Sequence, residues 1–261
     1  MSTQLEQWER AEVERSAAEA AHIGADGLAA DPANVARYVD PPADTTHPLE
    51  YAFHLLGDVH GKTVLEYGCG DGLNTILLAH RGARKIISLD ISPELIEIAR
   101  RRLEVNGRSE GVEFVVGSAH DMPLEDESVD VVLGIAILHH LDLRLAAREV
   151  RRVLRPGGRA IFEEPVRNSP LLKFARKLIP YRSPDVSPYE RPLTDAELTE
   201  FAAGYSSYRS RAFLLPTTNL AEVVPPLRRF VPACYRRDAA ILQRFPSLAY
   251  YATVRVVEMT K

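Results

Sequence analysis

The sequence is poor in cysteine and has no long apolar run. Its 261 residues hold two cysteines, Cys69 and Cys234. Two cysteines cannot build a disulfide framework or a four-thiolate zinc site, so we expect a reducing, cytoplasmic location. No stretch of roughly 18 apolar residues occurs, which leaves no segment that we would predict to span a membrane. Residues 1–22 lack both a basic start and an apolar core, and we therefore expect no secretory signal there.

The chain also lacks an excess of basic residues. Its formal net charge is −4, which disfavours nucleic acid as the main partner. The charge is distributed unevenly, because residues 1–60 carry eleven acidic and three basic side chains, whereas residues 227–244 carry five arginines and one aspartate. We interpret these segments as solvated faces of opposite sign. A second interpretation, that the basic segment meets an anionic substrate or surface, stays open.

From residue 61 onward, short β-branched runs alternate with helical stretches. This alternation predicts right-handed crossovers and a doubly wound parallel sheet. The expected strands are residues 62–67, 85–90, 112–116, 129–135 and 158–163, and the expected helices between them are residues 73–81, 93–106 and 143–154.

The two ends of the chain have weaker patterns. We expect helices at 4–22, 47–56 and 194–203, strands at 207–214 and 249–259, and breaks at Gly24, Gly27, Pro32, Pro41 and Pro42. Residues 171–179 are apolar on one side and basic on the other, which favours a cap helix over membrane contact. The expected organisation is an N-terminal helical cap (1–60), a core (61–164), and the end of the core sheet (165–261) with insertions at 165–192 and 216–247.

The strongest chemical signal is a glycine-rich turn, E-Y-G-C-G-D-G at residues 66–72, which ends a strand and opens a helix. Glycines allow a sharp turn and a close approach of ligand to backbone. The helix N-terminus also offers free amide donors to an anionic group. The third glycine, Gly72, comes one residue too early for the dinucleotide pattern G-x-G-x-x-G, in which glycine would replace Leu73.

Asp90 ends the second expected strand, 18 residues beyond Gly72. A carboxylate in this place can accept hydrogen bonds from both hydroxyls of a ribose. The alternative role, capping the next helix, is better filled by Ser92, because Ser92, Pro93 and Glu94 together form a complete helix start. We therefore predict that Asp90 binds a ribose.

Two more segments follow in order, G-S-A-H-D-M-P at 117–123 and V-D-V-V-L-G-I-A-I-L-H-H-L at 129–141. Together with the first two signals they resemble the class I S-adenosylmethionine-dependent methyltransferases. The similarity covers residues 62–163 and is strongest to the small-molecule subgroup described as ubiquinone/menaquinone-methyltransferase-like, or methyltransferase type 11. In that family the glycine loop wraps the methionine part of the cofactor, and the segment G-D-A-x-x-L-P cups the adenine.

The resemblance implies a Rossmann-like, seven-stranded mixed sheet with an antiparallel last pair and a helical cap. It also implies S-adenosyl-L-methionine as cofactor and S-adenosyl-L-homocysteine as product. Ser118 stands where the family commonly has aspartate, so a serine hydroxyl, the backbone or Asp121 would contact the adenine amino group instead. We expect His120 to be a partly exposed wall of the pocket. The cofactor-binding residues that the resemblance implies are Glu66, Gly68, Cys69, Gly70, Gly72, Asn74, Asp90, Ile91, Ser118, Ala119, His120 and Ile135.

His139 and His140 are the candidate catalytic residues, because histidine titrates near neutral pH and follows the fourth strand here. Adjacent residues at a strand–helix junction point in different directions, so we expect at most one to act, with His139 the first candidate. Glu163 and Glu164 are expected near the mouth, where they could orient a substrate or line water. The histidines and cysteines show no spacing typical of a metal site, and we expect no metal.

We therefore expect methyl transfer to an oxygen, nitrogen or carbon nucleophile of a small molecule. The alternatives are a lipid-quinone methyltransferase at a membrane face, a non-catalytic S-adenosylmethionine-binding protein, and a nicotinamide oxidoreductase, against which the early third glycine argues. Residues 134–137 do not resemble the N/D-P-P-Y type loop of base-amino methyltransferases, which argues against a nucleic-acid substrate. The sequence specifies neither the acceptor nor the oligomeric state.

Overall fold

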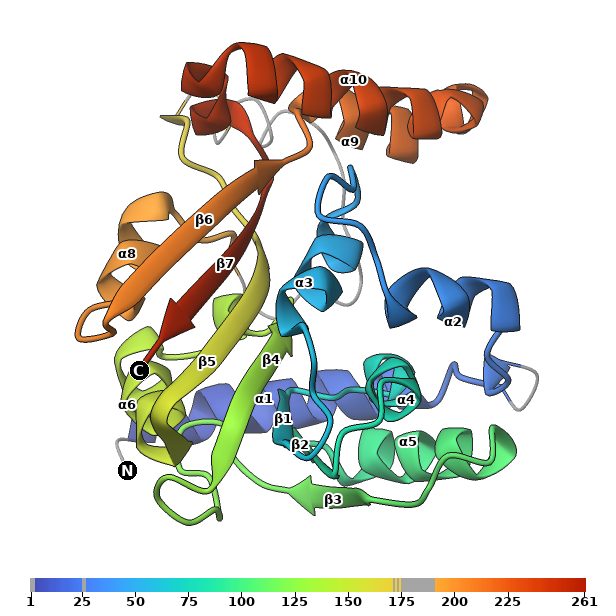
Figure 1. Cartoon of the computed structure of the whole chain (residues 1–261), viewed down its shortest axis with the longest axis vertical. Coiled ribbons are helices and arrows are strands. Elements are labelled where there is room, and N and C mark those ends of the chain that lie inside the picture. The colour runs from blue at the N-terminus through green and yellow to red at the C-terminus, as the bar shows by residue number, and fades with distance from the viewer. Residues whose placement is uncertain (1–2, 25–26, 171, 173, 175–190) are drawn as a thin grey trace.

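The computed structural model describes residues 3–24, 27–170, 172, 174 and 191–261. Among these residues, seven strands form one sheet in the order β3-β2-β1-β4-β5-β7-β6. Figure 1 shows the sheet with helices on both sides. The strands are β1 (Thr63–Tyr67), β2 (Lys85–Asp90), β3 (Val112–Val116), β4 (Val129–Ile135), β5 (Leu154–Pro165), β6 (Ser207–Phe213) and β7 (Val254–Thr260).

Strand directions confirm the expected doubly wound, Rossmann-like mixed sheet. The strands β3, β2, β1, β4 and β5 pair in parallel, and β7 runs antiparallel to both β5 and β6. From β1 the chain moves outward through β2 and β3, and it then returns to the other side of β1 with β4. A crevice forms at the carboxyl ends of strands where the order reverses in this way, and this is where such sheets bind ligands.

Two apolar clusters hold the helices on the two faces of the sheet. One cluster joins Tyr67 and Phe162 to α6 and α8, and the other joins Ile161 to α3, α4 and α5. Beyond the sheet, α1 lies against α5, while α9 and α10 stand at the far end of the molecule (Figure 1). The α-helices are α1 (Thr3–Ala20), α2 (Pro32–Val39), α3 (Pro48–Leu56), α4 (Leu73–His80), α5 (Pro93–Val105), α6 (Leu143–Val153), α8 (Asp195–Phe201), α9 (Pro216–Val223) and α10 (Val231–Arg244). Short 3-10 turns are η2 (Leu138–His140), η3 (Pro225–Phe230) and η4 (Pro246–Tyr251).

Two strands differ from the sequence prediction by more than one residue. The strand β5 begins at Leu154, before the turn signal at 155–158, because Leu154 pairs with Val129 across an irregularity in the β4–β5 register. It also ends at Pro165 rather than at residue 163, because Glu164 and Pro165 still pair with β7. The strand β7 begins at Val254 rather than at residue 249, because η4 occupies residues 246–251. The other predicted strand ends agree with the structure to within one residue.

Pro32 was wrongly predicted to break the chain, since it begins α2. The Asp31 side chain accepts a hydrogen bond from the Ala33 N–H, and Pro32 follows as the first helical residue. Proline is well suited to this position, because its missing N–H would have no partner inside the helix and its φ is already helical.

The structure tests only one of the two predicted insertions. Residues 216–247 contain helices, as expected. Most of the insertion predicted at 165–192, and most of the amphipathic segment 171–179, lie outside the described residues. In the described parts of the chain, no helix combines the length and apolar character needed to cross a bilayer.

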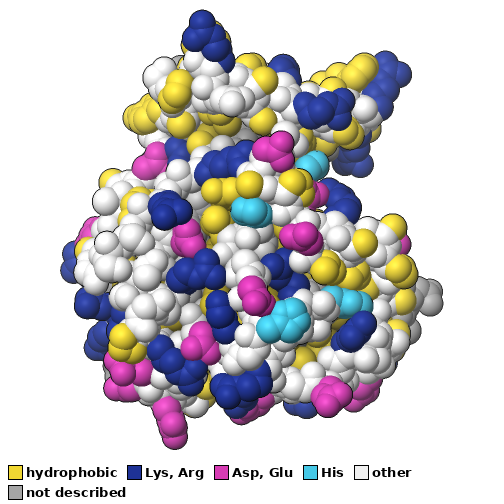
Figure 2. All heavy atoms as spheres, in the orientation of Figure 1, with side chains coloured by type: hydrophobic (Ala, Val, Ile, Leu, Met, Phe, Trp, Pro, Cys, Tyr) yellow, Lys and Arg dark blue, Asp and Glu magenta, His cyan; other side chains and the backbone are white. Residues whose placement is uncertain are grey.

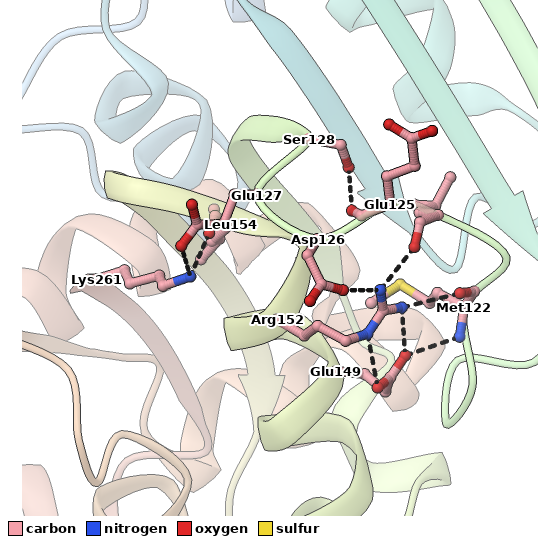
Figure 3. A network of polar contacts seen from close by, with 10 residues as sticks. Met122, Glu125, Asp126, Glu127, Ser128, Glu149, Arg152, Leu154 and Lys261 are labelled. Atoms are coloured by element: carbon pink, nitrogen blue, oxygen red, sulfur yellow. Dashed lines mark hydrogen bonds and ion pairs between the residues drawn. The ribbon is translucent and has the colours of Figure 1, made fainter.

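A buried ion pair fastens the β3–β4 connection to α6 (Figure 3). Arg152 donates from Nη2 to Glu149 Oε2 at 2.8 Å and to the Met122 carbonyl at 2.9 Å, and from Nη1 to the Leu124 carbonyl at 2.6 Å. Glu149 in turn accepts the Met122 N–H at 3.0 Å and is only 3% exposed. Burial alone would raise the pKa of Glu149, but these hydrogen bonds outweigh it and hold the pKa below its usual value.

We expect Arg152→Ala to destabilise the fold by about 2–4 kcal/mol, because it leaves the Glu149 carboxylate buried without its guanidinium. Urea unfolding measures the difference. The matched control is Arg144→Ala on the same helix, whose pair with Glu200 spans 3.7 Å between exposed side chains and should contribute less than about 0.5 kcal/mol. Equal losses for the two variants would contradict this account of the pair.

Candidate active site

A cavity of about 280 Å³ opens at the carboxyl ends of the central strands. One wall consists of residues that follow β1, β2, β3 and β4, and the other is a face of α1. The cavity lies at the reversal point of the strand order, where the fold favours a ligand. Its strand-side wall includes Gly68, Gly70, Asp90, Ile91, Gly117, Ala119, His120, Ile135, Ala136, Ile137 and His140.

The glycine loop needs glycine for two different reasons. Gly68 has φ +79°, and a Cβ on it would lie 2.7 Å from the Ile137 side chain. Gly70 has φ +51°, and no other group lies within 4 Å of the place of its Cβ. Gly68 therefore allows the loop to approach the segment after β4, while Gly70 leaves an open cradle that a side chain would fill.

Glu66 lies buried beneath this loop, with 2% of its surface exposed. Its Oε2 accepts hydrogen bonds from Thr75 and Ser88, whereas its buried Oε1 has no hydrogen-bond partner among the described residues. Burial raises the pKa of Glu66 to about 8. Glu66 thus places a carboxyl oxygen without a described hydrogen-bond partner beneath the glycine loop, which the family resemblance predicts to bind the cofactor.

Asp90 joins the ends of β1 and β2. Its Oδ2 accepts the Gly70 N–H at 2.8 Å, and its Oδ1 accepts the Ser92 N–H at 3.0 Å. Burial raises the pKa of Asp90, against the opposing effect of the Ser92 and Gly70 N–H groups. Each carboxylate oxygen can accept one more hydrogen bond. Asp90 can therefore still accept hydrogen bonds from two hydroxyl groups of a ligand in the cavity. Ser92 caps α5 as predicted, accepting the Leu95 N–H at 3.2 Å.

His120 is only 4% exposed, so the expectation of a partly exposed wall was wrong. Its Nδ1 lies 2.9 Å from Glu9 Oε1, and its Nε2 accepts the Asp142 N–H at 2.9 Å. The ring therefore carries its proton on Nδ1 and donates it to Glu9. The Ser118 hydroxyl also bonds to Glu9, so both side chains are engaged in holding α1 over the cavity.

The two histidines after β4 have different surroundings. His139 is buried, with Nδ1 at 2.8 Å from Glu164 Oε2, whereas His140 lines the cavity. The fully buried Glu164 also accepts the N–H groups of Ile137 at 2.9 Å and Leu138 at 2.6 Å. Glu164 therefore fixes the shape of the segment that carries both rings, and His140 is the ring that faces the cavity.

Glu163 lies on the opposite face of β5 from Glu164. Its Oε2 is buried and has no hydrogen-bond partner among the described residues. Burial and the neighbouring Glu164 carboxylate raise the pKa of Glu163 to about 8. Burial raises the pKa values of Tyr38 and Tyr235, and the nearby Glu163 carboxylate raises them further as a smaller effect.

The cavity wall contributed by α1 lies within the N-terminal helical cap expected at residues 1–60, but the sequence analysis named none of its residues. It consists of Trp8, Glu9, Glu12, Arg15, Ser16 and Glu19. Their spacing of three and four residues places them on one side of a helix, and this was the available signal. A helix side that is polar yet turned toward the protein indicates a polar cavity beneath it rather than an apolar core.

Seven of the predicted cofactor-binding residues line the cavity, namely Gly68, Gly70, Asp90, Ile91, Ala119, His120 and Ile135. Glu66, Cys69, Gly72, Asn74 and Ser118 are not part of its lining. Cys69 is buried, and a Cβ on Gly72 would lie 2.8 Å from Ala99 of α5, so Gly72 allows α4 and α5 to pack closely. The roles of all these residues at a cofactor stay predictions.

Comparison with known proteins identifies the central part of the chain. The family model of the methyltransferase domain matches residues 65–162. A probable phthiotriol/phenolphthiotriol dimycocerosates methyltransferase of Mycobacterium ulcerans is 36% identical over 51% of this chain and 56% of its own length. A demethylmenaquinone methyltransferase of Lactococcus lactis is 35% identical over 41% of this chain and 43% of its own. The chain thus spans about half the length of the curated relatives it matches. Residues 65–162 therefore resemble a methyltransferase domain.

The similarity in fold to solved structures extends over nearly the whole chain. The geranyl diphosphate C-methyltransferase of Streptomyces coelicolor, solved with S-adenosyl-L-homocysteine, superposes with a TM-score of 0.61 at 16% identity and covers 97% of this chain and 96% of its own. Class I methyltransferases use S-adenosylmethionine. The open cradle at Gly70 and the spare hydrogen-bonding capacity of Asp90, which both line the cavity, fit that cofactor.

We expect Gly70→Ala to weaken S-adenosylhomocysteine binding at least about tenfold, because the new methyl group fills the cradle. The control is Gly107→Ala, since Gly107 also has a positive φ (+62°) and open space around its Cβ but lies after α5, outside the cavity lining. Both variants should lose about 1–2 kcal/mol of stability, so calorimetric titration separates the binding effect from backbone strain. Equal affinities would contradict the placement of the cofactor at Gly70.

We expect Glu163→Gln to change how stability depends on pH. A carboxyl with a folded-state pKa of about 8 stabilises the fold fully below its unfolded pKa, and this contribution is lost as pH rises toward 8. Relative to the wild type, the variant's free energy of unfolding should therefore rise by about 4 kcal/mol between pH 5 and about 8.5, measured by urea unfolding. Glu104→Gln, at an exposed position of α5, controls for the removal of a carboxylate. If the difference in unfolding free energy between Glu163→Gln and the wild type does not change with pH, Glu163 does not have the raised pKa.

Proposed function

We propose that the protein transfers a methyl group from S-adenosylmethionine to an oxygen, nitrogen or carbon nucleophile of a small molecule. The observation that carries this proposal is the cavity in which the Gly70 cradle and the Asp90 carboxylate meet. The bound cofactor would supply a methyl group on a positively charged sulfur. The family model and the two methyltransferase relatives support the same reaction class.

The charge of the cavity favours a sulfonium ligand over a dinucleotide. Its lining holds the carboxyl groups of Glu9, Glu12, Glu19 and Asp90 and the guanidinium of Arg15. An acidic lining attracts a cationic cofactor and repels a pyrophosphate. The position of Gly72 also disfavours a dinucleotide, because it departs from the dinucleotide fingerprint.

The protein's main contribution would be placement of the two reactants. Holding a nucleophile in line with a methyl carbon can supply roughly 7–11 kcal/mol of a barrier. The α1 wall and the Ile137 side chain would exclude water from the methyl group, since both border the cavity. We accordingly propose that residues 61–164 form the cofactor-binding core and that residues 1–60 cap it.

His140 is the better candidate for a general base, although His139 was the first candidate from the sequence. His140 lines the cavity, so it can reach a proton on an acceptor bound there. His139 is bonded to Glu164 and its ring centre lies 4.1 Å from that of His140. We propose that His139 is a positioning residue that holds the His140 ring toward the acceptor.

The small-molecule class of the acceptor is supported by the relatives and by the fold neighbour, whose names refer to demethylmenaquinone and geranyl diphosphate. The test of the function is transfer of a labelled methyl group from S-adenosylmethionine to a panel of phenols, quinols, carboxylic acids and amines. Transfer to any member supports the proposal. Cofactor binding without transfer to any acceptor would instead favour the non-catalytic alternative.

For an acceptor that must lose a proton, we expect His140→Gln to lower kcat about 100-fold or more. The affinity for S-adenosylhomocysteine should stay within about threefold of the wild type, which shows that the fold and cofactor site are intact. An unchanged kcat would exclude His140 as the base.

A further inference from the structure

The helices between β6 and β7 form a lobe that differs in charge from the rest of the chain. This lobe, residues 216–251, comprises α9, η3, α10 and η4. It carries five arginines and two acidic residues in a protein whose net charge is −4. Figures 1 and 2 place it at the top of the molecule, where basic and hydrophobic side chains lie next to one another.

The arginines of α10 point outward on one side of the helix. Exposed positions recur at spacings of three and four residues, at Ala233, Arg236, Ala240 and Arg244. The opposite side holds Asp238, which is 1% exposed and accepts the Leu215 N–H at 2.7 Å. The helix therefore packs its Asp238 side against its own lobe. On the exposed side, Arg236 and Ala240 border an open pocket shared with β6, and Arg244 lies beyond this pocket at the end of the helix.

Most of these cations have no carboxylate partner in the part of the chain that the structure describes. Among the described residues, Arg237 is the one arginine of the lobe that pairs with a carboxylate, that of Asp238 at 2.7 Å. Arg228 donates from Nε to the Glu222 carbonyl at 2.9 Å, which leaves its charge uncompensated. An uncompensated basic face attracts an anionic partner.

Large apolar side chains accompany the arginines. Phe230 and Phe245 directly precede and follow α10, and they are 47% and 53% exposed. The guanidinium carbon of Arg229 lies 4.7 Å from the Phe230 ring centre, and that of Arg244 lies 5.4 Å from the Phe245 ring centre. The helix between the two pairs has 14 residues and is therefore about 21 Å long. Single exposed apolar residues are ordinary, but a group of them within a basic face indicates an interaction surface.

Four more apolar side chains extend this surface. Leu220 and Val223 of α9 are 54% and 55% exposed, and Tyr250 and Tyr251 of η4 are 45% and 41% exposed. Exposed aromatic and aliphatic groups next to arginines match the boundary between lipid headgroups and acyl chains, where rings enter the apolar layer and guanidinium groups stay with the phosphates.

We propose that the lobe docks onto an anionic lipid surface, with the α10 arginines on the headgroups and the two Arg–Phe pairs as anchors. The proposal is independent of the methyltransferase function, because no residue that carries it lines the cofactor cavity. Charge decides between a lipid and a second copy of the chain. A two-fold contact through this lobe would set the same arginines against one another, whereas a lipid surface supplies the missing negative charge.

The test is co-sedimentation of the full chain with phosphatidylcholine vesicles that contain either no anionic lipid or about one third phosphatidylglycerol. We expect binding to the anionic vesicles, little binding to the neutral ones, and weaker binding as salt increases. Arg229→Glu with Arg244→Glu should reduce the partition coefficient about tenfold or more. Phe230→Ser with Phe245→Ser should reduce it comparably, since it removes the apolar anchors.

The matched control is Arg101→Glu with Val105→Ser, which changes an exposed arginine and an exposed apolar residue on α5, away from the lobe in Figure 1. Titration with S-adenosylhomocysteine on every variant shows that each is folded. The proposal is overturned if anionic vesicles do not bind the wild type, or if the control loses binding as much as the lobe variants. It is also overturned if the lobe variants change only dimerisation or duplex-DNA binding, measured in parallel.

Discussion

The hydrogen bond from the Gly70 N–H to the Asp90 carboxylate joins the ends of the two central strands β1 and β2, and the cavity depends on this link. Leu89 strengthens it, because its carbonyl accepts the N–H groups of both Gly68 and Cys69 at 2.9 Å. The loop thus donates its own backbone N–H groups to the Leu89 carbonyl and the Asp90 carboxylate, and Gly68 and Gly70 put no side chain into the cavity. A ligand can approach the backbone directly, and Asp90 is aimed at it by the same bonds.

Buried carboxylates repeat this principle at other strand ends. Glu164 holds the segment after β4 through two backbone N–H groups and His139, and Glu149 holds the segment after β3 through the Met122 N–H and Arg152. A buried acid is stable only where such donors meet it. Glu66 and Glu163 each keep one buried oxygen that has no hydrogen-bond partner in the described parts of the chain, and burial raises the pKa of each of these acids to about 8.

The sequence predicted the sheet well, because the strands are local apolar runs and Ser92 and Thr194 form recognisable helix caps. It also located the glycine loop and Asp90, whose roles depend on neighbours close in sequence. It predicted a helical cap in residues 1–60 but not which α1 residues face the cavity, since the contact of Glu9 with Ser118 joins residues 109 positions apart. The different surroundings of His139 and His140 likewise follow from Glu164, a contact across 25 residues that spacing alone could not indicate.

A crystal structure of the protein grown with S-adenosylhomocysteine tests the central claim most directly. The account predicts that the nucleoside occupies the cavity between the glycine loop and α1, with both ribose hydroxyls on the Asp90 carboxylate and the amino-acid part over Gly70. A nucleoside bound elsewhere, or a cavity still closed by α1 with no ligand at saturating concentration, would contradict it.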